Sequence, residues 1–202
     1  MILFFAIFSK SAVFGIDFGS EYIKVSMAIL GKGIHVVLNQ QSKRLSPSYF
    51  SFWNNTNPNN SNKEDWTIKD LDQCSWSFLD SAYSHYLRYP QNSIKGMLPL
   101  LGKEHGFTRR ESFALILRHL IRTVNEGKNT PESARIVVSV DPTLSRQDRI
   151  ALIEAVNLSK TTLLEIIDSP SSAAHVYSLE RQNFFSSKPK NILFIDVGAE
   201  RT

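Results

Sequence analysis

Two short segments of the chain place an aspartate at the end of an apolar run and a glycine two positions later. In the first segment Asp17 precedes Gly19, and in the second Asp196 precedes Gly198. A carboxylate at the end of a strand can hold Mg²⁺ through the water shell of the ion. The glycine allows a sharp backbone turn that brings N–H groups close to a phosphate. Two such corners facing each other would bind a polyphosphate and its metal, although one corner alone is also ordinary turn chemistry.

The residues around these corners predict a β-rich first part and an alternating last part. Apolar, β-rich runs joined by short turns predict a β-meander with strands at 13–18, 22–29 and 34–38, followed by a further strand at 48–53. The last third predicts the order strand, helix, strand, helix, strand at 135–140, 145–156, 162–167, from 169 onward, and 192–196. This alternation is typical of a parallel α/β arrangement.

The middle of the chain predicts helices. Residues 73–87 and 94–101 carry uneven helical patterns, and residues 109–126 carry the clearest one. Thr108 and Glu111 have the spacing of a capping box at the start of this third helix. The sequence therefore predicts an α/β fold with a helical segment between its two halves.

Composition excludes several classes of protein. The chain has 202 residues, of which 42% are hydrophobic and 21% are charged, so it is neither disordered nor collagen-like. The net charge of +4 is spread along the chain and does not indicate a nucleic-acid-binding protein. The single cysteine, Cys74, excludes a disulfide framework within the chain and a multi-cysteine zinc site.

The first residues predict a secretory signal. An apolar run at 2–8 is followed by small residues, with cleavage expected after Ser11, so that residues 1–11 form the signal. The run is too short for a membrane span, and a buried N-terminal strand is the alternative. Glycosylation sequons at Asn54, Asn59 and Asn157, the first two in an Asn-rich surface loop at 54–65, favour the endoplasmic reticulum lumen.

The two corners, residues 17–20 and 196–198, resemble the phosphate loops of the heat shock protein 70 family. Further matches resemble its large endoplasmic-reticulum branch, the hypoxia up-regulated and glucose-regulated 170-kDa-like chaperones, at 20–25, 37–47, 100–103, 135–140 and 166–174. The resemblance implies an actin-like ATPase (ribonuclease H-like) fold. On this reading residues 12–202 form a partial nucleotide-binding domain, with the first lobe and the opening strand of the second, as expected for a piece of a longer protein.

The resemblance also implies a site for ATP or ADP and Mg²⁺. The implied phosphate contacts are Asp17, Gly19, Ser20, Glu21, Tyr22, Asp196, Gly198 and Thr202. Asp17 and Asp196 are implied to hold Mg²⁺ through water. The switch between the lobes is implied to lie at Asp141, Pro142 and Arg149.

Departures from the family pattern affect catalysis. Leu98 stands where the family has a catalytic lysine, and Ser169 stands where it has a metal-site glutamate. Ala199 and Glu200 replace glycines of the second phosphate loop. Loss of one charge-stabilising group commonly lowers a rate by about 10²–10³. No residue is therefore assigned as catalytic, and hydrolysis is expected to be weak or absent.

Taken with the resemblance, these residues predict an ATP-binding, chaperone-related protein of the secretory pathway. It would assist folding as a holdase or a nucleotide exchange factor, with a lumenal heat shock protein 70 chaperone and unfolded client proteins as partners. No nucleic-acid or membrane-spanning role is expected. The alternatives are a slow ATP-hydrolysing chaperone and a non-binding interaction module or truncated remnant.

Overall fold

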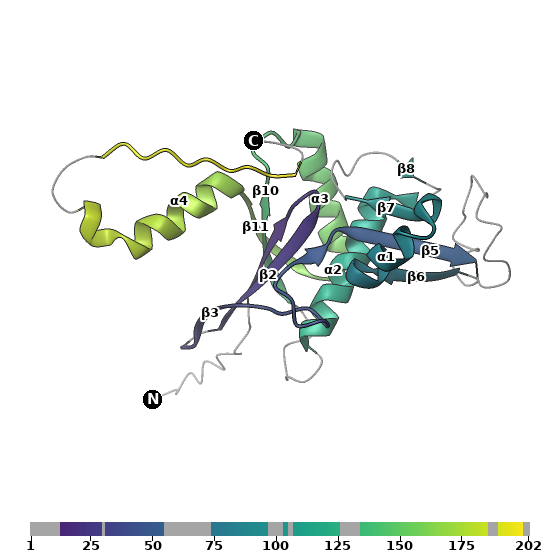
Figure 1. The fold of residues 1–202 in the computed structure, drawn as a ribbon. Helices are drawn as coiled ribbons and strands as arrows, with labels where there is room; N and C mark the ends of the chain where they lie inside the picture. Colours follow the sequence, from purple (N-terminus) through teal and green to yellow (C-terminus); the bar gives the residue numbers. More distant parts are fainter. Residues whose placement is uncertain are drawn as a thin grey trace, which may run out of the picture.

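The computed structural model describes residues 13–29, 31–54, 74–96, 103–104, 107–125, 134–185 and 190–199, and these form a mixed α/β fold (Figure 1). The expected class is therefore confirmed. The expected signal at 1–11, most of the Asn-rich loop, Leu98 and Thr202 lie outside the described residues.

The larger sheet joins the antiparallel and the parallel halves of the fold. Its strand order is β11-β10-β1-β2-β3, and β4 pairs with β2. The strands are β1 (Val13–Phe18), β2 (Tyr22–Ile29), β3 (Gly33–Val36), β4 (Ser46–Pro47), β10 (Arg135–Val140) and β11 (Thr162–Asp168). β1 is antiparallel to β2 and parallel to β10, so the predicted meander and the predicted α/β part share this strand.

The two faces of the larger sheet differ in burial. On β1, Phe14, Ile16 and Phe18 are at most 3% exposed, and alternate residues of β10 continue the same buried face. The Phe18 ring lies 4.1 Å from that of Phe113 on α2 (Arg109–Asn125). The period-two alternation of a strand therefore sends Asp17 to the opposite, partly open face.

Helices cover the two faces unequally. α2 and α3 (Arg146–Leu158) pack together on the buried face, whereas α4 (Ser169–Glu180) lies on the other side beside β10 and β11 and has no buried residue (Figure 1). The predicted capping box of α2 is confirmed, because Glu111 N–H donates to Thr108 Oγ1 and Thr108 N–H donates to a Glu111 carboxylate oxygen. None of the helices in the described part of the chain has the length and apolar content to span a bilayer.

A second sheet packs beside the first and corrects two helix predictions. It contains β5 (Tyr49–Asn54), β6 (Cys74–Phe78) and β7 (Ser93–Lys95) in the order β6-β5-β7, with α1 (Leu79–Tyr86) and a 3-10 turn, η2 (Pro90–Asn92), against it. A short hairpin of β8 (Lys103–Glu104) and β9 (Phe107–Thr108) precedes α2.

The predicted helix at 73–87 is wrong before residue 79, because residues 74–78 pair with β5. The chain changes from strand to helix at Leu79, the first residue of α1, which has a φ of 58°. The predicted helix at 94–101 is wrong at its start, because Ile94 and Lys95 belong to β7. In both segments the pairing partner is β5, which lies far away in the sequence.

The predicted strand at 192–196 is also wrong. After α4 and the 3-10 turn η3 (Gln182–Phe185), residues 190–198 pair with no strand in the described part of the chain. Apolar side chains of this segment face solvent, since Leu193 is 82% and Ile195 is 72% exposed. Phe194 contacts the Tyr177 ring of α4 edge-on, with ring centroids 5.7 Å apart. An apolar run without a hydrogen-bonded neighbour does not form a strand.

The packing of α3 yields a test of the core. Leu152 is fully buried, so Leu152→Ala removes contacts and leaves a cavity, which is expected to cost about 2–5 kcal/mol of unfolding free energy. Its neighbour Ile153 is 42% exposed, and Ile153→Ala is expected to change stability by only about 0.5 kcal/mol. Urea unfolding of both variants measures the difference, and equal losses would contradict this packing.

His85 on α1 yields a pH dependence. Its ring stacks on Trp53 at 4.8 Å, and burial lowers the pKa of His85 below its usual value of about 6.5. Below this pH the unfolded chain binds a proton that the folded chain resists, so stability falls as the pH drops. His85→Phe is expected to reduce the loss of unfolding free energy between neutral pH and pH 5.5. Parallel slopes for wild type and His85→Phe would contradict this assignment.

Candidate functional site

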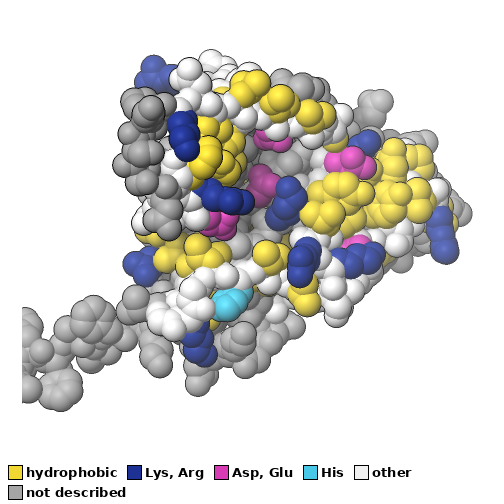
Figure 2. Space-filling model, turned by 60° about the vertical axis from the view of Figure 1, so that its left-hand side comes forward, with side chains coloured by type: hydrophobic (Ala, Val, Ile, Leu, Met, Phe, Trp, Pro, Cys, Tyr) yellow, Lys and Arg dark blue, Asp and Glu magenta, His cyan; other side chains and the backbone are white. Residues whose placement is uncertain are grey.

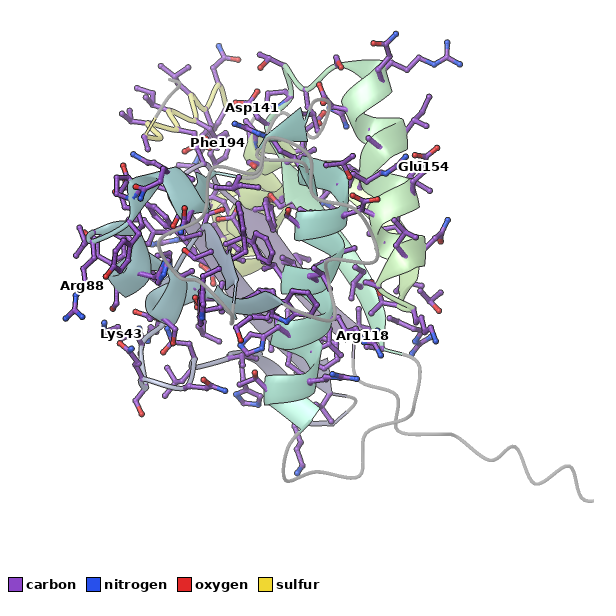
Figure 3. All side chains as sticks on the ribbon, turned by 90° about the vertical axis from the view of Figure 1, so that its right-hand side faces the viewer. Lys43, Arg88, Arg118, Asp141, Glu154 and Phe194 are labelled. Carbon is purple, nitrogen blue, oxygen red and sulfur yellow. The ribbon has the colours of Figure 1, made fainter. Side chains whose placement is uncertain are left out.

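An open cleft of about 1090 Å³ lies between the open face of the larger sheet, the first turns of α3 and α4, and residues 194–199. Asp17–Tyr22 of the first corner and Asp196–Gly198 of the second both line it. Asp141 and Phe194, which lie far apart in the sequence, come together at the same end of the molecule (Figure 3). The structure thus brings the two predicted corners into one cleft.

The first corner is a tight turn that requires glycine. Gly19 N–H donates to the Tyr22 carbonyl at 3.1 Å, and a Cβ at Gly19 would lie only 2.7 Å from that oxygen. The turn is anchored from behind, since Ser48 N–H donates to the Glu21 carbonyl and Gly96 N–H donates to the Ser48 carbonyl, both at 2.8 Å. These two hydrogen bonds tie the turn, through Ser48, to the chain at the end of β7.

Sheet register places a row of polar side chains beside this turn. Asp17 stands opposite Lys24 of β2 and beside Ser139 of β10. Lys24 Nζ lies 3.0 Å from Asp17 Oδ2, and both residues line the cleft. Lys24 was not among the predicted site residues, although the β1–β2 hairpin could have indicated it, because residues 17 and 24 lie the same distance from the turn centre.

The second corner enters the cleft as an extended segment. Asp196, Val197 and Gly198 line the cleft and remain exposed to solvent. Ala199, which departs from the family pattern, lines the cleft as well. Thr202, implied as a phosphate contact, lies outside the described residues.

Two helix N-termini face the cleft. Ser145 caps α3, with its Oγ accepting from Asp148 N–H at 3.1 Å and donating to Asp148 Oδ2 at 2.7 Å. At the start of α4, Ser169 Oγ lies 3.0 Å from Ser139 Oγ and donates to the Val140 carbonyl at 3.1 Å. Because the first N–H groups of a helix carry partial positive charge, both ends favour an anionic ligand.

The three implied switch residues divide into two groups. Asp141 and Pro142 line the cleft, and Asp141 Oδ1 accepts from Thr143 N–H at 2.7 Å in a turn. Arg149 is not among the described lining residues. It donates to Asp168 Oδ1 at 2.7 Å and to the Pro142 carbonyl at 3.4 Å. Arg149 therefore joins the loop after β10 to the end of β11.

Acidic groups dominate the charge of the cleft. Among the described lining residues the carboxylates are Asp17, Glu21, Asp141, Asp148 and Asp196, and the only basic side chain is Lys24. Figure 2 shows acidic side chains in the hollowed middle of one face, with basic side chains close to them. A bare polyphosphate would be repelled by this excess, whereas one accompanied by Mg²⁺ would be less so.

The donor set fits a hydrated metal better than a directly chelated one. No group of three or more His, Cys, Asp or Glu side chains suited to a metal ion occurs among the residues that the structure describes. Asp17 and Asp196 reach the cleft from opposite corners, and Mg²⁺ usually keeps several waters while binding one or two carboxylates and the phosphates of a ligand. The residues present therefore fit Mg²⁺ held through water and phosphate.

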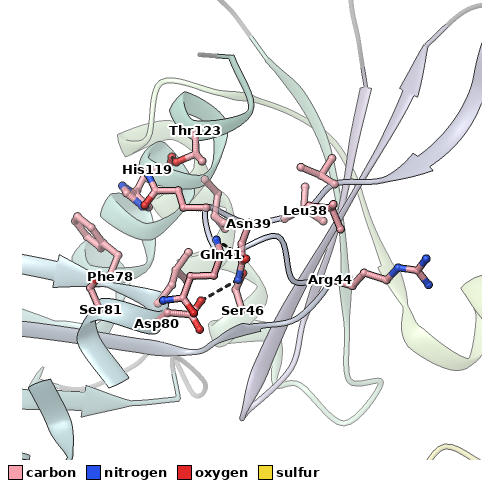
Figure 4. A pocket seen from close by; sticks show the side chains of 15 residues that line it. Leu38, Asn39, Gln41, Arg44, Ser46, Phe78, Asp80, Ser81, His119 and Thr123 are labelled. Atoms are coloured by element: carbon pink, nitrogen blue, oxygen red, sulfur yellow. Dashed lines mark hydrogen bonds between the residues drawn. The ribbon is translucent and has the colours of Figure 1, made fainter. Parts of the chain in front are cut away.

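A smaller cavity of about 50 Å³ lies between the loop after β3 and α1 (Figure 4). There Asn39 Nδ2 donates to Asp80 Oδ2 at 2.8 Å, and Lys43 Nζ lies 3.2 Å from Asp80 Oδ1. Asn39 also donates to the carbonyl of Leu45, which lines the main cleft. This cavity is far too small for a nucleotide, and its hydrogen bonds brace the loop that contributes Leu45 to the main cleft.

The glycosylation predictions fall on different kinds of structure. Asn157 lies near the end of α3, and the sequon residue Ser159 is 4% exposed with its hydroxyl donating to the Val156 carbonyl. Asn54 is the last residue of β5, and Asn59 lies outside the described residues. All three sites remain predictions, of which Asn157 is the one held within a helix.

Comparison with known proteins gives the following similarities. Hypoxia up-regulated protein 1 of Xenopus laevis is 22% identical over 95% of this chain. The chain resembles the heat shock protein 70 family along nearly its whole length. The 97 kDa heat shock protein of Mesocentrotus franciscanus is 25% identical over 93% of the chain. The heat shock protein 70 homolog lhs1 of Schizosaccharomyces pombe is 23% identical over 95% of it. No protein-family model matches the chain.

The resemblance to the heat shock protein 70 family covers only part of each relative. The chain spans 32% of the Xenopus laevis protein, 23% of the Mesocentrotus franciscanus protein and 24% of the Schizosaccharomyces pombe protein. The names of these relatives are those of hypoxia up-regulated and heat shock proteins, which confirms the resemblance to the heat shock protein 70 family inferred from the sequence.

The first corner yields a test of its glycine. In Gly19→Ala the new methyl group would meet the Tyr22 carbonyl at 2.7 Å, so the turn must open, at an expected cost of about 1–3 kcal/mol. Ser20→Ala, in the same turn, adds no atom and serves as the matched control. Chemical denaturation measures both, and the geometry of the turn is contradicted if the two variants are equally stable.

Proposed function

We propose that this chain is the first lobe, with the opening segment of the second, of an actin-like nucleotide-binding domain in a chaperone of the endoplasmic reticulum lumen. The observation that carries the proposal is the meeting of Asp17–Tyr22 and Asp196–Gly198 in one cleft. Both segments contain an aspartate followed two positions later by a glycine, and 173 residues lie between Tyr22 and Asp196 along the chain. The proposed ligand is Mg²⁺-bound ADP or ATP.

Several features of the cleft support this ligand. The turn residues Gly19, Ser20 and Glu21 line the cleft, and the N-termini of α3 and α4 add partial positive charge. The excess of carboxylates over Lys24 favours a nucleotide that arrives with its metal. The chemistry that Mg²⁺ supplies when bound is neutralisation of phosphate charge.

The proposed role is regulatory binding with weak or absent hydrolysis. Leu98 replaces the family lysine, and Ser169 uses its hydroxyl to bond Ser139 and the Val140 carbonyl within the fold. Neither side chain supplies a charge for phosphoryl transfer. The protein would therefore act as a holdase for unfolded clients or as a nucleotide exchange factor for a lumenal heat shock protein 70 chaperone.

A second candidate is an interaction module that binds no nucleotide. It is favoured by the charge of the cleft, since the described lining residues include five carboxylates and one lysine, and this balance opposes phosphate binding when no metal is present. The titration with Mg-ADP and Mg-ATP described next separates this candidate from the first.

The proposal is tested by thermal-shift and calorimetric titration with Mg-ADP and Mg-ATP. Binding stabilises the folded state by about 2.7 kcal/mol when the ligand is at 100 times its Kd. Asp196→Asn is expected to weaken binding roughly 10-fold to 100-fold, the usual effect of losing a carboxylate that orients a metal and its waters. Glu165→Gln, at an exposed position of β11 outside the described lining, is the matched control and is expected to bind as wild type does.

Absence of stabilisation at millimolar Mg-nucleotide would overturn nucleotide binding and support the interaction module. A second measurement follows the release of labelled ADP from a lumenal heat shock protein 70 chaperone. Faster release in the presence of this protein is expected for an exchange factor, and an unchanged rate leaves the holdase role.

A further inference from the structure

Lys24 occupies a distinctive place in the cleft. It is the only basic side chain among the described residues that line it, and its Nζ lies 3.0 Å from Asp17 Oδ2. The pairing is set by the backbone, because Asp17 and Lys24 are directly opposite on β1 and β2. Side chains directly opposite on neighbouring strands share a face and lie within contact distance.

The ammonium group lies where a divalent cation would also be attracted. Asp17 is one of the two carboxylates proposed to hold Mg²⁺ through water, and an ammonium bound to it neutralises the same charge. Both side chains are partly exposed, Lys24 by 56% and Asp17 by 40%, so the ion pair is weak and can be displaced. Lys24 and a metal ion therefore compete for one carboxylate.

We propose that Lys24 is a built-in counterion of Asp17 that lowers the preference of the cleft for Mg²⁺-bound over metal-free nucleotide. This inference rests on the proposed function. The lysine acts in two directions: it repels Mg²⁺ near Asp17, and its ammonium attracts the phosphates of a nucleotide that carries no metal. It is a specificity-determining residue, and it takes no part in hydrolysis.

The decisive quantity is the ratio of the Kd for ADP in EDTA to the Kd for ADP in excess Mg²⁺, measured by isothermal titration calorimetry. In Lys24→Met the Kd in excess Mg²⁺ falls, because Mg²⁺ is no longer repelled by the ammonium group. The Kd in EDTA rises, because the phosphates of the metal-free nucleotide lose their attraction to that group, so the ratio rises. The expected rise is about twofold to fivefold, the scale of a partly exposed ion pair. Lys24→Gln provides a second neutral variant should the methionine variant not fold.

Two controls separate this role from a purely structural one. Lys24→Arg keeps the charge opposite Asp17 and is expected to keep the wild-type ratio. Lys32→Met removes an exposed lysine from the turn between β2 and β3, outside the described lining, and is also expected to leave the ratio unchanged. A structural ion pair would change thermal stability in Lys24→Met without changing the ratio.

The outcomes distinguish the two proposals. If wild type and the neutral variants all bind Mg-ADP and have the same ratio of the two Kd values, the counterion role is overturned and nucleotide binding stands. If neither wild type nor any variant binds ADP with Mg²⁺ present, the proposed function is overturned together with this inference. A raised ratio in Lys24→Met and Lys24→Gln, restored in Lys24→Arg, supports it.

Discussion

The hydrogen bonding of β1 to two different neighbours positions most of the cleft. One edge of β1 pairs with β2 in the antiparallel sense, which fixes Lys24 opposite Asp17. The other edge pairs with β10 in the parallel sense, which brings the loop after β10 and the starts of α3 and α4 to the same end of the sheet. Because side chains alternate along a strand, the residues that fill the core also determine which residues face the cleft.

The cleft combines two opposing electrostatic features. The N-termini of α3 and α4 favour an anion, whereas the five carboxylates among the described lining residues favour a cation. A ligand that carries both signs, such as a metal-bound phosphate, satisfies both. Lys24 moderates this balance from within the sheet, while Arg149, which bonds Asp168 and the Pro142 carbonyl, acts only on the shape of the wall.

Sequence reasoning succeeded where local patterns and structure agree. The strands Val13–Phe18 and Arg135–Val140 and the cap of α2 follow from alternation and capping chemistry within each segment. It failed where pairing with another strand determines the structure. Residues 74–78 form a strand because they pair with β5, whereas residues 192–196 form none because they pair with no described strand. The two corners were found from the aspartate and glycine spacing that they share. The ion pair of Lys24 with Asp17 depends on the register of the β1–β2 hairpin, and the equal distance of the two residues from the turn was the only sequence signal for it.

The alternating burial of β1 also protects the chain against a misassembled sheet. If β1 slipped by one residue against its neighbours, Phe14, Ile16 and Phe18 would turn towards the cleft and Asp17 would enter the core. An unpaired carboxylate there would cost several kcal/mol, in addition to the lost burial of three aromatic and aliphatic side chains. Asp17 therefore contributes charge to the cleft and also disfavours the shifted register of β1. Neutralising Asp17 would weaken both effects together.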